Sequence, residues 1–184
     1  MNLINVLKTL ANVEPPSRTE YLNEAIKIAK RWAAGPFCYG KGSASSNRKK
    51  MDKQCDRLYE IVKKLKLSLG PNKPFYRGVN LSRSKLLSLL NGATIQPIYV
   101  YESWSSNLEV PRLFGIFILK KIPPTNQRVC YLPELIQYGG PDSANELITK
   151  SKPFNINDVF MVYDPDTRKF TKDIKEGLRL NINI

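Results

Sequence analysis

The spacing of apolar residues changes near residue 74 of this 184-residue chain. Before that point, in segments 15–36 and 52–71, apolar side chains recur every three or four residues, as on one face of an α-helix. After it, short apolar runs alternate with turn-forming sequences, which is typical of strands. This change predicts a single α+β domain in which a helical lobe, residues 1–70, packs on a β-rich core, residues 71–184.

Local signals mark the ends of the helices in the first half of the chain. Ser17 and Glu20 have the spacing of a capping box, and Gly35-Pro36 stops the helix that they begin. Residues 40–50, "GKGSASSNRKK", are rich in glycine, serine and lysine and predict a flexible basic loop. The first 16 residues predict a short amphipathic helix.

The second half predicts strands with one helix between them. The helix is expected over residues 82–92, where Asn91-Gly92 forms a C-terminal stop. Turn sequences such as "PPTN" and "YDPDT" separate the apolar runs. The strands are expected at 75–79, 98–105, 115–122, 128–132, 146–149, 159–164 and 178–184.

The charge balance and the missing histidine restrict the chemistry. The chain has 29 Lys and Arg against 16 Asp and Glu, a net charge of +13, which favours anionic partners such as nucleic acid or ribosomes. A lysine-rich solubilising surface is the ordinary alternative. Without histidine, His-based triads and His-ligated metal sites are excluded, and we expect no metal.

Cysteine usage and hydropathy indicate a cytoplasmic protein without a membrane partner. Cys38, Cys55 and Cys130 are odd in number and widely spaced, which suits reduced thiols and offers no metal-ligand spacing. No run of about 18 apolar residues exists, and the N-terminus lacks the pattern of a signal peptide.

Three short stretches contain candidate functional residues. In "PFYRGVN", Arg77 lies in an apolar strand, where a guanidinium needs an anion, and Gly78 lets another group approach the backbone. In "YESWSSN", serines flank Trp104 at a strand end, and in "GGPDSANELITK" a turn-forming loop leads to a lone acid, Glu146. Each stretch also has an ordinary interpretation. Arg77 would face solvent, Trp104 would lie in the core with the serines on the solvent-exposed face of the strand, and Glu146 would be solvated.

In this order, the three stretches resemble the R-S-E mono-ADP-ribosyltransferases, especially the small phage-encoded and toxin-type members. That family has an Arg often followed by Gly, an STS-type segment after an aromatic residue, and an ExE or QxE loop ahead of apolar residues. The resemblance covers roughly residues 52–164, and a chain without histidine cannot belong to the H-Y-E branch. The implied fold is a helical lobe packed on a mixed two-sheet β core.

The resemblance also implies an activity and roles for individual residues. ADP-ribose would pass from NAD to a macromolecular acceptor with release of nicotinamide. Arg77 would bind the NAD phosphates, and Glu146 would hold the nicotinamide-side ribose and stabilise developing positive charge. Ser105 would hydrogen-bond Glu146, with Ser103 as the alternative because both fit the STS pattern. The residues implied on the NAD side are Arg77, Gly78, Ser103, Trp104, Ser105, Ser106 and Tyr138.

The chain departs from the family at Ala144, two residues before Glu146, where relatives have Glu or Gln. Alanine cannot accept a proton from a guanidinium, which disfavours arginine as the acceptor unless Asp142 or Glu102 substitutes. With the basic charge, this favours a nucleic acid or ribosome-associated acceptor, and Ala144 and Tyr138 are the residues expected to set acceptor choice.

Two alternatives to transfer remain open. One is a basic nucleic-acid- or ribosome-binding protein without catalysis, and the other is an NAD glycohydrolase that uses water as acceptor. In each case we expect a monomer.

Overall fold

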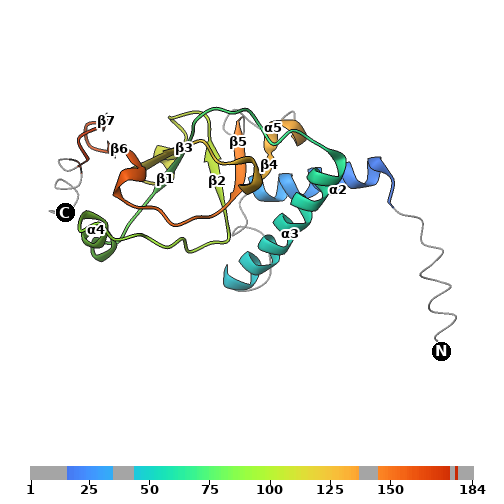
Figure 1. Ribbon diagram of the computed structural model, residues 1–184, viewed down its shortest axis with the longest axis horizontal. Coiled ribbons are helices and arrows are strands. Elements are labelled where there is room, and N and C mark those ends of the chain that lie inside the picture. The colour runs from blue at the N-terminus through green and yellow to red at the C-terminus, as the bar shows by residue number, and fades with distance from the viewer. Residues whose placement is uncertain (1–15, 35–43, 137–144, 175–176, 178–184) are drawn as a thin grey trace.

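The computed structural model describes residues 16–34, 44–136, 145–174 and 177. Within them the chain forms four α-helices, three short 3-10 helices and one seven-stranded sheet, so the α+β class is confirmed (Figure 1). The helices are α2 (Arg18–Ala33), α3 (Ala44–Leu65), α4 (Arg83–Leu90) and α5 (Leu132–Leu135), and the 3-10 helices are η1 (Pro111–Leu113), η2 (Thr125–Gln127) and η3 (Ile156–Asp158). The strands are β1 (Phe75–Val79), β2 (Tyr101–Ser105), β3 (Phe117–Lys121), β4 (Arg128–Tyr131), β5 (Glu146–Lys150), β6 (Val159–Asp164) and β7 (Lys169–Thr171).

The helices α2 and α3 form an antiparallel pair at one end of the molecule (Figure 1). The capping box that starts α2 is confirmed, because the Glu20 backbone N–H donates to Ser17 Oγ at 3.2 Å and Glu20 Oε2 accepts from the Ser17 N–H. Lys64 near the end of α3 donates to the Tyr21 hydroxyl near the start of α2 at 2.8 Å. The pair buries its apolar face against the sheet residues Tyr101, Val129, Cys130 and Ile148.

The N-terminal part of α3 contradicts the expected flexible loop over residues 40–50. The helix already begins at Ala44, because tertiary contacts outweigh the weak helix propensity of serine and asparagine. Arg48 donates to the backbone oxygen of Tyr101, and Met51 is 3% exposed in the core of the lobe. The expected helix over residues 1–16 lies outside the described residues except for Pro16, where they begin. The expected strand over residues 178–184 lies outside them entirely.

The seven strands follow the order β4-β5-β2-β1-β3-β6-β7, and every pairing is antiparallel. The expected mixed two-sheet core is therefore not seen in the described part of the chain. One seam in the sheet is weak: β1 and β2 pair only at Tyr76 and Ser105, whereas β1 pairs with β3 at five positions. The sheet thus consists of two halves, β4-β5-β2 and β1-β3-β6-β7, that meet at a single residue pair.

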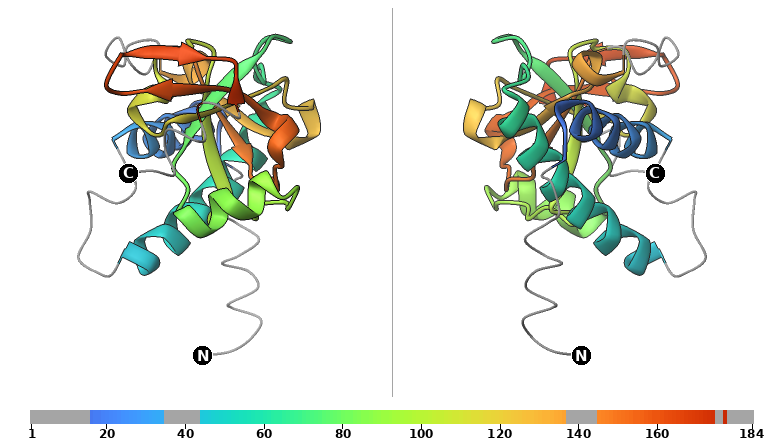
Figure 2. Two further views of the ribbon diagram at one scale, coloured as in Figure 1. Left: turned by 90° about the vertical axis from the view of Figure 1, so that its left-hand side faces the viewer. Right: turned by 90° about the vertical axis from the view of Figure 1, so that its right-hand side faces the viewer.

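A different set of side chains covers the opposite face of the sheet. Phe75, Trp104, Leu119 and Leu147 share a core there with Leu89 of α4. The two turned views in Figure 2 show the helix pair α2 and α3 in front on one side and β6 and β7 in front on the other. The α2–α3 lobe therefore covers only the β4-β5-β2 half of the molecule.

Gly78 has the role that its position after Arg77 predicts, which is to permit a close backbone approach. A Cβ on Gly78 would lie 1.9 Å from the backbone oxygen of Pro111, the first residue of η1. Any larger side chain would therefore push η1 away from β1. The approaching group is thus a segment of the protein itself.

Two of the cysteines are buried free thiols, Cys55 and Cys130. Burial raises the pKa of the Cys55 thiol from 9.0 to about 12, so it stays protonated at neutral pH. Within the described residues, no helix combines the length and the apolar character needed to cross a membrane.

Candidate functional site

The Glu146 carboxylate lies under the C-terminal turn of α2, at the first position of β5. Its Oε1 accepts hydrogen bonds from the Ser103 hydroxyl on β2 and from Trp32 Nε1 on α2, the latter at 2.9 Å. The Trp32 N–H also lies 2.9 Å from Ser103 Oγ, so the indole donor is shared between the two oxygens. Glu146 is half-buried, and no described residue donates to its second oxygen, Oε2.

Asn145, the residue before Glu146, fixes the backbone direction at the start of β5. Asn145 has φ 83°, in the left-handed region that asparagine tolerates better than most residues. Its side-chain oxygen accepts a hydrogen bond from the Tyr131 hydroxyl at 3.0 Å, and its backbone oxygen accepts one from the Ser106 N–H at 3.2 Å. Asn145 is thus held from both sides, and the start of β5 cannot rotate freely.

Ser105, the serine expected to hydrogen-bond Glu146, does not do so in the structure. It is the direct cross-strand partner of Glu146, but its Oγ accepts from the Asn107 N–H at 3.0 Å and the side chain is buried. Alternate residues of a strand share a face, so Ser103 lies on the same face as Ser105. The carboxylate reaches along that face to Ser103, which was the alternative candidate.

Arg77 leaves β1 on the other face of the sheet and reaches the seam between β1 and β2. Its Nη1 donates to the backbone oxygen of Ser103 at 2.8 Å, and its Nε lies 3.4 Å from Glu102 Oε2. Burial lowers the pKa of the guanidinium, whereas the charges of Glu102 and Glu146 raise it, and Arg48 lowers it further. Arg77 is therefore the ion-pair partner of Glu102, and the charge of Glu146 acts on it from the opposite face of the sheet.

Glu102 is a buried anion held by three donors. Besides Arg77, Lys121 Nζ lies 3.6 Å from its Oε1, and Trp104 Nε1 donates to the same oxygen at 3.0 Å. Burial lowers the pKa of Lys121 while Glu102 raises it. Because Glu102 and Ser103 are adjacent on β2, they lie on opposite faces, so Glu102 is not placed to substitute for a second carboxylate beside Glu146.

Trp104 was expected to pack against a ligand, but only 2% of it is exposed. It belongs to the core that includes Leu119 and Leu147, with the Lys121 ammonium 4.1 Å from its ring centre. In this conformation the indole presents no face to a ligand. Of the remaining expected residues, Ser106 contributes a backbone donor, whereas Tyr138 and Ala144 lie outside the described residues.

Two residues from the helical lobe complete the cluster and were not predicted. Trp32 supplies the shared donor described above, and Arg48 places its guanidinium 4.0 Å from the ring centre of Tyr99 and 5.5 Å from that of Trp32. Trp32 falls in segment 15–36, where the apolar spacing is helical, but that spacing gives no indication of a polar partner. A buried tryptophan needs a partner for its N–H, and this was the one available signal.

The cluster is built from the Glu146 carboxylate, held at one oxygen by Ser103 and Trp32, with the Arg48 guanidinium near the Trp32 ring and Arg77 on the opposite face of the sheet. No group of acidic, cysteine or histidine side chains able to hold a metal ion occurs among the described residues. Such an arrangement can bind an anion beside a site that stabilises positive charge. No protein-family model, no curated protein and no solved structure matches this chain.

Proposed function

We propose that this protein transfers ADP-ribose from NAD to a macromolecular acceptor and releases nicotinamide. The observation that carries the proposal is the Glu146 carboxylate, which Ser103 and Trp32 hold at the start of β5. The resemblance to the R-S-E transferases assigns its Arg, Ser and Glu to Arg77, to one of two serines and to Glu146. The contact made by Ser103 favours that serine over Ser105.

The chemistry of the cluster suits the departure of nicotinamide. Cleavage of the glycosidic bond leaves positive charge on the ribose carbon and ring oxygen, and a preorganised carboxylate stabilises it without reorganisation. In this proposal Oε2 of Glu146 meets the nicotinamide-side ribose, since Oε1 already accepts two hydrogen bonds. The guanidinium groups of Arg77 and Arg48 are the candidates for the pyrophosphate, because arginine binds phosphate oxygens in a bidentate manner.

The acceptor in this proposal is a nucleic acid or a ribosome-associated molecule rather than arginine. Ala144 offers no carboxylate two residues before Glu146, and Glu102 is directed to the other side of β2. The net charge of +13 supports an anionic acceptor.

Incubation with NAD labelled in its adenylate half tests the proposal. We expect label in macromolecules of a cell extract, and digestion with nuclease or protease separates nucleic acid from protein acceptors. Label released only as free ADP-ribose would indicate the glycohydrolase instead. If NAD is not consumed and millimolar NAD does not raise the melting temperature, the proposal is wrong, since a ligand bound at ten times its Kd stabilises by about 1.4 kcal/mol.

The two serines give a matched pair of variants for the same assay. Ser103→Ala removes a hydrogen bond to a charged oxygen, worth about 1.5–3 kcal/mol, so we expect NAD turnover to fall about 10- to 100-fold. Ser105→Ala removes a bond to the backbone N–H of Asn107 and should leave turnover within about threefold of the wild type. The opposite ranking would return Ser105 to the role that the resemblance first gave it.

A further inference from the structure

The antiparallel helices α2 and α3 enclose a groove of about 310 Å³ on the outer surface of the lobe. Two cations from each helix line it: Lys27 and Arg31 from α2, and Lys53 and Arg57 from α3. All four side chains are exposed. Each pair is spaced four residues apart, so its members lie on one face of their helix, about 6 Å apart along the axis.

The groove keeps most of this positive charge. Among its lining residues the only acid is Glu24, and Arg57 binds that carboxylate through both oxygens, at 2.9 and 2.7 Å. The charges of Lys27, Arg31 and Lys53 therefore remain uncompensated by acids within the groove. Lys50, exposed and one turn before Lys53, extends the row of cations along α3.

We propose that this groove binds the sugar-phosphate backbone of a nucleic acid strand. Phosphates of one strand follow each other at about 3.4 Å along a helix axis, so a pair of cations about 6 Å apart spans roughly two nucleotides. Two facing rows of this kind can hold a strand between them. The binding needs no NAD and no Glu146, and it is therefore independent of the proposed catalysis.

The other residues of the groove favour a nucleic acid over a membrane surface. Ile28, the apolar residue that lines the groove, is 7% exposed and lies in the shared core of the lobe. It cannot insert into a lipid layer, whereas peripheral helices that bind membranes present large apolar side chains for that purpose. The neighbouring Gln54 adds an amide, which suits hydrogen bonds to sugar or phosphate oxygens.

The test measures binding of a fluorescent 20-nucleotide RNA strand, and of the same sequence as DNA, by anisotropy without NAD. If four phosphates are neutralised, the plot of log K against log salt should have a slope of about −3. The charge-reversal variant Lys27→Glu/Lys53→Glu should bind at least about tenfold more weakly and reduce the slope by about 1.5. Binding to anionic phospholipid vesicles is measured in parallel, as the test of the alternative that the groove binds a membrane surface.

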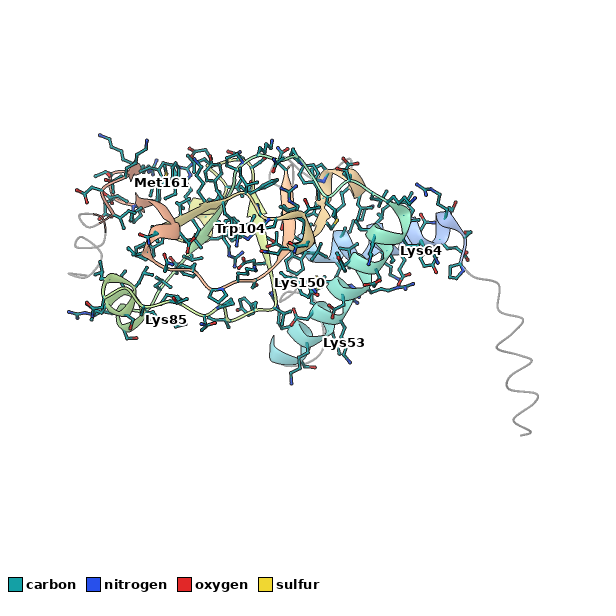
Figure 3. All side chains as sticks on the ribbon, viewed as in Figure 1. Lys53, Lys64, Lys85, Trp104, Lys150 and Met161 are labelled. Atoms are coloured by element: carbon teal, nitrogen blue, oxygen red, sulfur yellow. The ribbon has the colours of Figure 1, made fainter. Side chains whose placement is uncertain are left out.

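Lys85→Glu/Lys152→Glu is the matched control, since it changes the net charge by the same amount at positions that do not line the groove. Figure 3 shows that Lys85 on α4 lies apart from Lys53 on α3. We expect it to retain binding within about threefold. An equal loss in both variants would mean a general charge effect and overturn the proposal. It would also be overturned if the wild type bound vesicles but neither RNA nor DNA. Circular dichroism must show that each variant is folded.

Discussion

Glu146→Gln is expected to lower NAD turnover about 100- to 1,000-fold and to leave the fold intact. An amide has nearly the shape of the carboxylate and still offers an oxygen to Ser103 and Trp32. What it loses is the negative charge proposed to stabilise the developing cation, and removing one such preorganised group costs about 3–4 kcal/mol of transition-state stabilisation. Turnover of labelled NAD measures the loss, and the melting temperature reports the fold.

The matched control is Glu109→Gln, which removes the same charge from an exposed side chain whose partner is Arg112. It should leave turnover unchanged. The thermal shift caused by NAD should also persist in Glu146→Gln, because the arginines proposed to bind the phosphates are untouched. If Glu146→Gln turns over NAD at the wild-type rate, Glu146 is not the catalytic carboxylate, and the activity of the protein depends on another residue.

The elements that the sequence predicted best are those whose signals are local. β1 and β6 have the expected bounds, 75–79 and 159–164, because an apolar run between turn-forming residues defines each. The strand order could not be predicted, since it depends on pairings such as β2 with β5, more than 40 residues apart. The early start of α3 was missed because Arg48 and Met51 are fixed by contacts that spacing does not reveal.

The candidate site was predicted only in part, because local sequence signals reveal single residues but not the long-range contacts between them. Glu146 and Arg77 were recognisable because each is a charged residue within or next to an apolar run. Alternation places Ser103 and Ser105 on one face, so it cannot decide which of them reaches Glu146. The contribution of Trp32 comes from a residue 114 positions away in the chain, and only the packing of α2 on the sheet brings it there.

Gly78→Ala is expected to destabilise the protein by about 3 kcal/mol or more. The added methyl would lie 1.9 Å from the Pro111 oxygen and 2.9 Å from the Gly115 nitrogen, and all of these contacts are backbone, which cannot move aside as a side chain can. For a chain of this length, each kcal/mol lowers the melting temperature by about 2–4 °C, so we expect a loss of about 6–12 °C or failure to fold.

Gly92→Ala separates this clash from the general cost of replacing a glycine. Gly92 has φ 83° but no atom within 4 Å of an added Cβ, so its replacement should cost only the left-handed strain, about 1–2 kcal/mol. Equal melting temperatures for the two variants would mean that η1 does not press on β1 as described. Because Gly78 directly follows Arg77, a folded Gly78→Ala protein should also show a smaller thermal shift with NAD, as the displaced strand carries Arg77 away from the seam beside Ser103.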